Sequence, residues 1–209
     1  MGNPERFWDL FSNKYDRVTK GSDGTRYKTA GMTKKYLNAG SFVLDYGCGT
    51  GIFACELSSC VKKITAIDIS SKMLEEAGRK AQKLNITNTV FERASIFDGR
   101  FQQNSFDAVL AFNVLLFIKD PASVIGRIYE LLKPGGYFLS STECGGEKRS
   151  AIINMITSFL SSAGIVPYVR FFKICELEDS ITGGNFQIVE TGNFYTLNQP
   201  NHFVAAKKP

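Results

Sequence analysis

The sequence predicts an α/β fold in which a doubly wound, mostly parallel sheet of seven strands carries helices on both faces. Short apolar runs alternate with helix-like segments from about residue 42 onward, an order typical of βαβ units. One run, FDAVLAFNV (106–114), is apolar almost throughout, as expected of a strand buried on both faces. The C-terminal segment has the pattern of two strands and a turn, which would add an antiparallel last strand.

The first two strands are predicted at 41–46 (SFVLDY) and 63–69 (KITAIDI), because both runs are short, apolar and rich in β-formers. A helix-like stretch from 52 to 60 connects them. Ser70 can cap the helix that follows, since a serine hydroxyl accepts from unpaired N–H groups at a helix start. The apolar residues of that helix recur with a 3.6-residue period: Met73, Leu74, Ala77, Ala81 and Leu84.

The third strand is predicted at 89–94 and the fourth at 106–114. Asp120 and Pro121 then begin a helix, with the acid at the cap and proline at the first helical position. The apolar face of this helix comprises Val124, Ile125, Ile128, Leu131 and Leu132. We expect KPGG (133–136) to end the helix and YFLSST to form the fifth strand at 137–142.

The remaining chain is predicted to hold another helix and the two final strands. The helix carries Ile152, Ile153, Ile156, Phe159 and Leu160. The strands fall at 186–197 and 202–208. No internal repeat, low-complexity segment or linker interrupts the sequence, so we expect residues 1–209 to form a single domain. Residues 1–40 have the pattern of helices and are expected to form an N-terminal helical cap over one end of the sheet.

The composition excludes several classes of function. The net charge of +5 is spread over 25 basic and 20 acidic residues without a basic run, so a nucleic-acid partner is not expected. Five cysteines without a C-x-x-C pair, and a single histidine, His202, predict no metal site. We expect reduced thiols and a cytoplasmic location, with no signal peptide and no membrane span.

The stretch VLDYGCGTG (43–51) places three alternating glycines directly after the first strand. In an open parallel sheet, ligands bind beyond the carboxyl ends of the strands, where a following helix leaves backbone N–H groups unpaired. The dinucleotide pattern G-x-G-x-x-G is not met, because the third glycine arrives one residue early. Asp45, inside the motif, would repel a pyrophosphate and suits a cation instead.

The pattern Asp45-x-Gly47-x-Gly49-x-Gly51 resembles motif I of the class I S-adenosylmethionine-dependent methyltransferases of the small-molecule type, which have a Rossmann-like fold. The resemblance continues through an acid after the second strand, Asp68, and through segments 106–121 and 131–141. It implies that residues 41–142 form the cofactor-binding core. Residues 143–209 would then supply substrate-side helices and the final hairpin.

The same resemblance assigns roles to individual residues. It implies S-adenosylmethionine as the cofactor, with S-adenosylhomocysteine as its product. Asp45 would lie near the ammonium group of the cofactor, and Asp68 would accept from both ribose hydroxyls in a bidentate contact. The implied cofactor-binding positions are Asp45, Tyr46, Gly47, Cys48, Gly49, Gly51, Asp68, Ile69, Met73, Ser95, Ile96, Asn113 and Val114.

Two positions depart from the family pattern. Ser95 stands where the family often has Asp, although its hydroxyl can still accept a hydrogen bond and the N–H of Ile96 can still donate one. Leu116 stands where many relatives have His, so proton transfer by that His is absent. No catalytic base is assigned. Tyr15 on the entry helix and Glu143 after the fifth strand are candidate substrate contacts, and each is as well explained by packing or surface exposure.

The sequence therefore predicts methyl transfer from S-adenosylmethionine to a small molecule. Signatures of DNA, pyrimidine-ring and protein-arginine methylation are not found. The apolar segments 112–118 and 166–173 favour an aromatic, quinone-like or lipid-like acceptor. Two alternatives are a module that binds the cofactor without turnover and an NAD-dependent oxidoreductase. The methylated atom (O, N, S or C) and the oligomeric state are left open.

Overall fold

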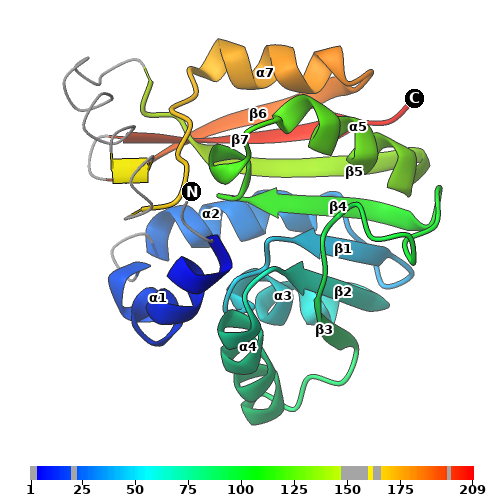
Figure 1. The fold of residues 1–209 in the computed structure, drawn as a ribbon. Coiled ribbons are helices and arrows are strands. Elements are labelled where there is room, and N and C mark those ends of the chain that lie inside the picture. Colours follow the sequence, from blue (N-terminus) through cyan, green and yellow to red (C-terminus); the bar gives the residue numbers. More distant parts are fainter. Residues whose placement is uncertain (1–3, 20–22, 147–159, 162–165, 197–198) are drawn as a thin grey trace.

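The computed structural model describes residues 4–19, 23–146, 160–161, 166–196 and 199–209. Seven strands form one sheet in the order β3-β2-β1-β4-β5-β7-β6 (Figure 1). The strands are β1 (Phe42–Tyr46), β2 (Lys63–Asp68), β3 (Thr89–Arg93), β4 (Phe106–Phe112), β5 (Leu132–Glu143), β6 (Gln187–Thr196) and β7 (Gln199–Lys207). The helices are α1 (Pro4–Val18), α2 (Asp23–Lys34), α3 (Ile52–Leu57), α4 (Ser71–Lys83), α5 (Pro121–Leu131) and α7 (Ile174–Gly183), with short 3₁₀ turns η2 (Ser58–Cys60) and η3 (Leu115–Phe117).

The pairing of the strands confirms the predicted sheet. Strands β1 to β5 pair in parallel, whereas β7 runs antiparallel to both β5 and β6. From β1 the chain builds outward to β2 and β3, and it then returns to place β4 on the other side of β1. This reversal opens a crevice at the carboxyl ends of β1 and β4, where open α/β sheets bind their ligands.

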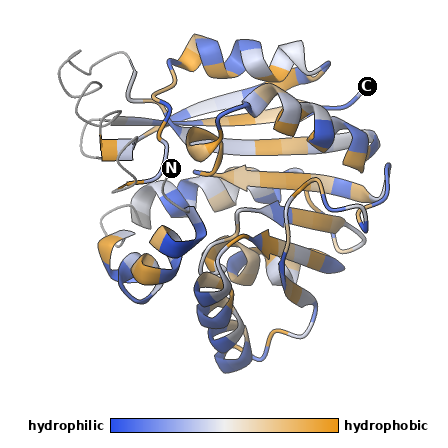
Figure 2. Ribbon diagram, viewed as in Figure 1, coloured by the Kyte–Doolittle hydropathy of each residue, from blue (hydrophilic) through white to orange (hydrophobic). Residues whose placement is uncertain are grey.

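The sheet separates two hydrophobic clusters, because successive side chains on a strand point to opposite faces. Val43 packs in the cluster that includes α2 and α3, and the next residue, Leu44, packs in the cluster that includes α5 and α7. Residues of β4 contribute to both clusters, which explains why this strand is apolar almost throughout. Figure 2 shows the hydrophobic residues along the central strands and a largely hydrophilic α4 at the periphery.

The KPGG segment begins β5 and does not form a loop before it, so the prediction of a fifth strand confined to 137–142 was too short. Leu132 already pairs with Phe106, and the register then shifts before Tyr137 pairs with Ala108. Gly135 has a φ of +78°, and a Cβ on Gly136 would lie 2.9 Å from the carbonyl oxygen of Lys133. The glycines therefore permit a bulge in the strand.

The predicted helix starts agree with the structure. The Ser70 hydroxyl accepts from the N–H of Met73, and the Asp120 carboxylate accepts from the N–H of Ser123. The fourth strand ends at Phe112, two residues earlier than predicted, because Asn113 adopts a left-handed conformation with φ of +51°. The helix predicted around 152–160 falls almost wholly outside the described residues.

The two N-terminal helices differ in position. Helix α2 packs on one face of the sheet through Ala30, whereas α1 lies beyond the carboxyl ends of the strands and packs on α4 (Figure 1). Within the part of the chain that the structure describes, no helix has the length and apolar character needed to span a bilayer.

Candidate functional site

The glycine loop follows β1 and is tied to the end of β2. The N–H groups of Gly47 and Cys48 both donate to the carbonyl oxygen of Ile67, at 2.9 and 3.0 Å. The N–H of Gly49 donates to Oδ2 of Asp68 at 2.9 Å. The loop conformation therefore depends on the acid that the sequence placed at the end of the second strand.

All three glycines have positive φ, with values of +70° at Gly47, +53° at Gly49 and +72° at Gly51. A Cβ on Gly47 would lie 2.5 Å from Cγ2 of Val114. A Cβ on Gly51 would lie 2.8 Å from both the Ala77 side chain and the Phe91 ring. Gly49 has no atom within 4 Å of the equivalent point, so only its backbone conformation favours glycine.

This difference predicts unequal effects of alanine at two of these positions. Both Gly47→Ala and Gly49→Ala force a non-glycine residue into the left-handed region, at a cost of roughly 1–2 kcal/mol. Gly47→Ala adds the clash with Val114, so it should lower the melting temperature of the free protein by several degrees more than Gly49→Ala. Thermal unfolding by circular dichroism measures both. Equal losses would contradict the close approach of Val114.

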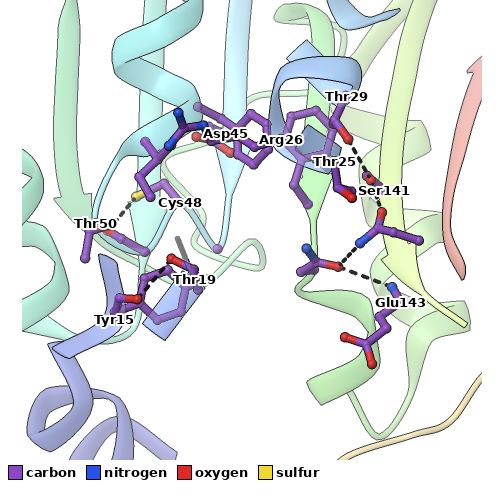
Figure 3. A pocket seen from close by; sticks show the side chains of 17 residues that line it. Tyr15, Thr19, Thr25, Arg26, Thr29, Asp45, Cys48, Thr50, Ser141 and Glu143 are labelled. Carbon is purple, nitrogen blue, oxygen red and sulfur yellow. Dashed lines mark hydrogen bonds between the residues drawn. The ribbon is translucent and has the colours of Figure 1, made fainter. Parts of the chain in front are cut away.

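Two cavities meet above the glycine loop. The first, of about 140 Å³, extends from the loop toward α2, β5 and β7 (Figure 3). The second, of about 300 Å³, extends toward the end of β2, α4 and the segment after β4. The residues common to both walls are Tyr15, Gly47, Gly49, Phe112 and Asn113. A ligand long enough to occupy both cavities would therefore cross the glycine loop.

The second cavity is mostly apolar. Its walls include the predicted positions Tyr46, Gly47, Gly49, Asp68, Ile69, Met73, Asn113 and Val114. Trp8 of α1 and Phe117 of η3 also line it, and their rings pack edge to face with centroids 4.9 Å apart. Pro167 and Tyr168 add to the wall, which brings the segment predicted to line a hydrophobic pocket, 166–173, to this site. Such a cavity suits a flat apolar group that carries a polar substituent near Asp68.

Asp68 has acceptor capacity beyond its backbone contacts. Its Oδ1 accepts from the N–H of Ser70 at 2.9 Å, and its Oδ2 accepts from the N–H of Gly49. The carboxylate also accepts from the N–H of Ile69, and the side chain lines the second cavity. Burial raises the pKa of Asp68, and the N–H donors oppose that rise. With three of about four lone-pair sites occupied, Asp68 can accept at least one further hydrogen bond.

Asp45 is a buried carboxylate on the wall of the first cavity, with 2% of its surface exposed. Its Oδ2 has no hydrogen-bond partner among the described residues. Burial, and next the charge of Asp68, raises the pKa of Asp45 to about 7. A buried carboxylate without a partner is costly, and a cation placed beside it would remove that cost. Asp45 therefore suits the binding of an ammonium group, as the sequence predicted.

Tyr15 of α1 covers the junction of the two cavities. Burial, with the nearby charges of Asp68 and Asp16, raises its pKa, so the phenol stays neutral. The helix is held in place by acids on the face toward the core. Asp9 accepts from the Ser70 hydroxyl at 2.6 Å, and Asp16 accepts from the Thr50 hydroxyl at 2.6 Å and pairs with Lys80 at 2.8 Å. Together these contacts hold α1, and with it the aromatic ring of Tyr15, over the site.

Three predicted cofactor positions do not line either cavity. Gly51 lies at the start of α3 and packs against α4 and β3. Ser95 is exposed and its hydroxyl accepts from the N–H of Phe97 at 3.3 Å, while Ile96 is fully buried in the core. Ala94, one residue earlier, lines the second cavity instead. The roles of Gly51, Ser95 and Ile96 at the cofactor stay predictions.

The first cavity contains residues that the sequence reasoning missed. Glu143 and Cys48 were expected there, but Thr25, Arg26, Thr29, Ser141 and Asn201 also line it. They come from α2, β5 and β7, which are distant in sequence, and Figure 3 shows Thr29, Ser141 and Glu143 on one side of the cavity. No local motif marks them. The threonines of α2 that line the cavity, Thr25 and Thr29, are buried, which only the packing of this helix on the sheet reveals.

Two other reactive side chains are explained by packing. His202 lies between Oδ1 of Asn193 and Oε1 of Glu178, at 2.8 and 2.9 Å, and lines neither cavity. Burial lowers its pKa against the pull of Glu178. Burial, with Asp45 and Asp68 nearby, raises the pKa of the Cys48 thiol, which disfavours the reactive thiolate. Among the described residues, no cluster of three acids, cysteines or histidines could hold a metal ion.

Comparisons with known proteins identify the same class of protein. A family model described as a methyltransferase domain matches residues 37–170. The chain is 38% identical over 105 residues to a ubiquinone biosynthesis O-methyltransferase of Albidiferax ferrireducens, covering 50% of this chain and 42% of the relative. It is 31% identical over 149 residues to a demethylmenaquinone methyltransferase of Oceanobacillus iheyensis, covering 65% and 63%. The alignments thus span less than two thirds of either relative.

The fold is also found in solved structures. The [4+2]-cyclase SpnF superposes with a TM-score of 0.79 at 16% identity, over 100% of this chain and 97% of that one. A cyclase on the same framework shows that the fold does not by itself decide the reaction. The family model is more specific than the fold, because it matches well over half of the residues. From this match, on a seven-stranded and mostly parallel sheet with an antiparallel end, we conclude that the chain belongs to the class I S-adenosylmethionine-dependent methyltransferases.

Proposed function

We propose that the protein transfers a methyl group from S-adenosylmethionine to an oxygen of a small, oxygenated aromatic molecule of the phenol or hydroxyquinone class. The observation that carries the acceptor class is the composition of the first cavity. Phe53 and Phe112 contribute an aromatic pair with centroids 4.5 Å apart, and Thr29, Ser141 and Asn201 contribute hydroxyl and amide groups. A ring with oxygen substituents matches both kinds of wall better than a lipid-like chain does.

The residues at the two cavities fit the cofactor that the family uses. Asp68 lines the second cavity and would accept from the ribose hydroxyls, as the family resemblance implies, and Asp45 has a buried oxygen for the ammonium group. Ile69, which is 41% exposed, and Met73 offer apolar surface to the adenine. The glycine loop lies between these two groups of residues. Because glycine has no side chain, the amino-acid part of the cofactor can approach the backbone closely there.

The main contribution of the protein to the reaction is to position the two reactants. S-adenosylmethionine supplies an electrophilic methyl group. A lone pair of the acceptor oxygen forms the new bond to the methyl carbon, and the electrons of the broken carbon–sulfur bond stay on the sulfur. Tyr15 and Trp8 cover the site and exclude water. The carboxylates on the first cavity are Asp45, assigned to the ammonium group, and Glu143, which is exposed at its edge. An acceptor that ionises in solution needs only orientation in this site.

The curated relatives support an oxygenated ring as the acceptor. The names of two of them refer to ubiquinone and demethylmenaquinone, and the first is an O-methyltransferase. Two alternatives are tested directly. A non-catalytic module would bind the cofactor without transferring a methyl group, and an NAD-dependent oxidoreductase would prefer NADH. The orphaned oxygen of Asp45 argues against a pyrophosphate in this loop.

Binding and transfer are measured separately. Trp8 is the single tryptophan and lines the second cavity, so its fluorescence should report S-adenosylhomocysteine binding, and NADH should compete weakly. Protein incubated with methyl-labelled S-adenosylmethionine should then label 2-hydroxy-1,4-naphthoquinone or a catechol. The variant Asp68→Ala, with its weakened cofactor binding, serves as the control at a cofactor concentration that saturates only the wild type. Binding without transfer to any phenol or hydroxyquinone would contradict the proposed acceptor class, and tighter binding of NADH would contradict the cofactor.

A further inference from the structure

A row of hydrogen bonds joins four polar side chains along one wall of the first cavity. Thr29 Oγ1 and Ser141 Oγ are 3.2 Å apart, and Ser141 Oγ bonds to Oδ1 of Asn201. Nδ2 of Asn201 bonds to Oδ1 of Asn113 at 2.9 Å, and the backbone N–H of Glu143 reaches the same Oδ1 at 3.2 Å. The residues come from α2, β5, β7 and the end of β4. Part of the row is visible in Figure 3.

One backbone group decides the direction of every bond in this row. The N–H of Glu143 can only donate, so the atom of Asn113 that it meets must be the amide oxygen. The atom of Asn201 that contacts this oxygen must then be its NH₂ group. The other end of the Asn201 amide is consequently an oxygen, which accepts from the Ser141 hydroxyl. Because that proton is used, the Thr29 hydroxyl must donate to Ser141.

The row therefore leaves the NH₂ group of Asn113 as its free donor end. Oδ1 of Asn113 already accepts twice, and no hydrogen bond within the described residues uses Nδ2. The backbone is constrained as well, since the N–H of Asn113 donates to the carbonyl oxygen of Ser141 at 2.7 Å and φ is +51°. Asn113 lines both cavities, so this donor is held at their junction.

We infer that Asn113 presents its NH₂ group as a preset donor to the acceptor molecule, and that it selects an acceptor whose oxygens carry a negative charge over one with neutral carbonyl oxygens alone. This inference rests on the proposed function. A preorganised donor loses no conformational entropy on binding and favours the ionised form of an acidic oxygen. Acceptors that present only a hydrogen-bond donor at this point, such as an ammonium group, would be rejected because two donors would face each other.

The test uses an acceptor of this class as a binding probe, in the presence of saturating S-adenosylhomocysteine so that no transfer occurs. The probe is 2-hydroxy-1,4-naphthoquinone, which is ionised at neutral pH, and 1,4-naphthoquinone is its counterpart without the hydroxyl. Binding is followed by quenching of Trp8 or by calorimetry. Wild-type protein should bind the hydroxyquinone at least tenfold more tightly than the unsubstituted quinone, as expected of one charge-assisted hydrogen bond of about 1.5–3 kcal/mol.

The variant Asn113→Asp keeps both accepted hydrogen bonds and a residue type that tolerates positive φ, and it removes the donor. It should weaken hydroxyquinone binding at least tenfold and leave the affinity for S-adenosylhomocysteine within about twofold. Asn104→Asp is the matched control. Asn104 also has positive φ, +53°, and its Oδ1 accepts from Lys208, but it lines neither cavity. This control should bind both ligands as the wild type does.

Each outcome decides the inference. Equal binding of the two quinones by wild-type protein would overturn it without any variant. Unchanged hydroxyquinone binding by Asn113→Asp would also overturn it, and a loss of S-adenosylhomocysteine binding in that variant would overturn it in favour of the cofactor contact that the sequence predicts for Asn113. If the wild type fails to bind S-adenosylhomocysteine at all, the proposed function fails first, and that failure is seen in the cofactor titration alone.

Discussion

Replacing Asp68 by alanine is expected to weaken S-adenosylhomocysteine binding by about a hundredfold, the largest effect of any single change considered. The carboxylate would lose two hydrogen bonds to the ribose hydroxyls, each worth about 1.5 kcal/mol with a charged acceptor. It would also lose the bond from the N–H of Gly49 and so loosen the glycine loop. Calorimetric titration of the variant measures the loss.

A matched control separates binding from local structure. Asp120→Ala also removes a carboxylate that accepts from a backbone N–H, that of Ser123, but Asp120 lines neither cavity. It should lower the melting temperature slightly through the lost helix cap and leave the cofactor affinity unchanged. Asp68→Asn should fall between the wild type and Asp68→Ala, because one acceptor oxygen remains. An affinity of Asp68→Ala within twofold of the wild type would show that the ribose does not lie at this acid.

Replacing Asp45 by asparagine is expected to stabilise the free protein and weaken cofactor binding together. Burial raises the pKa of Asp45 to about 7, well above the value of an exposed carboxyl, so the folded state holds a proton that the unfolded chain releases. Stability from this group is therefore greatest in acid and is lost as the pH rises from about 4 through 7. Asparagine removes that loss. The melting temperature of free Asp45→Asn should exceed that of the wild type by a few degrees at pH 8, by less at pH 5, and hardly at all near pH 4.

The cofactor should show the opposite dependence on pH. An ammonium group beside Asp45 favours the ionised carboxylate, so wild-type affinity for S-adenosylhomocysteine should fall as the pH drops below 7, by at most about tenfold per pH unit. Asp45→Asn should bind at least tenfold more weakly at pH 8 and vary little between pH 6 and 7.5. Titrations at these pH values provide the measurement. A variant that binds as tightly as the wild type, or that is less stable at pH 8, would remove Asp45 from the ammonium site.

Much of the fold could be predicted because local sequence patterns reflect burial on the two faces of the sheet. The run at 106–114 predicted a central strand, and β4 is buried on both faces except at Asp107. Helix starts at Ser70 and Asp120 were predictable because capping uses residues three positions apart. The start of β5 was missed, because a proline and two glycines are typical of a loop, whereas β4 pairs with the chain from Leu132 onward.

The half of the site that we propose for the cofactor lies close to sequence motifs, and the half that we propose for the acceptor does not. The glycine loop and Asp68 follow directly from their strands, so the order of strands in a parallel sheet brings them together. Directly hydrogen-bonded residues in the row from Thr29 to Asn113 are up to 112 positions apart, and neither its members nor its direction follow from any local pattern. Only packing brings α2, β5 and β7 to one cavity wall.

By itself, the sequence determined the sheet, the methyltransferase motif and the two acids, because each depends on neighbours within one strand and its turn. The tertiary structure alone decided that Asp45 keeps an oxygen without a partner, that Tyr15 covers the junction, and that the amide of Asn113 points its donor outward. These properties depend on burial and on hydrogen bonds between distant segments, since a side chain's protonation and orientation are set by the groups packed against it.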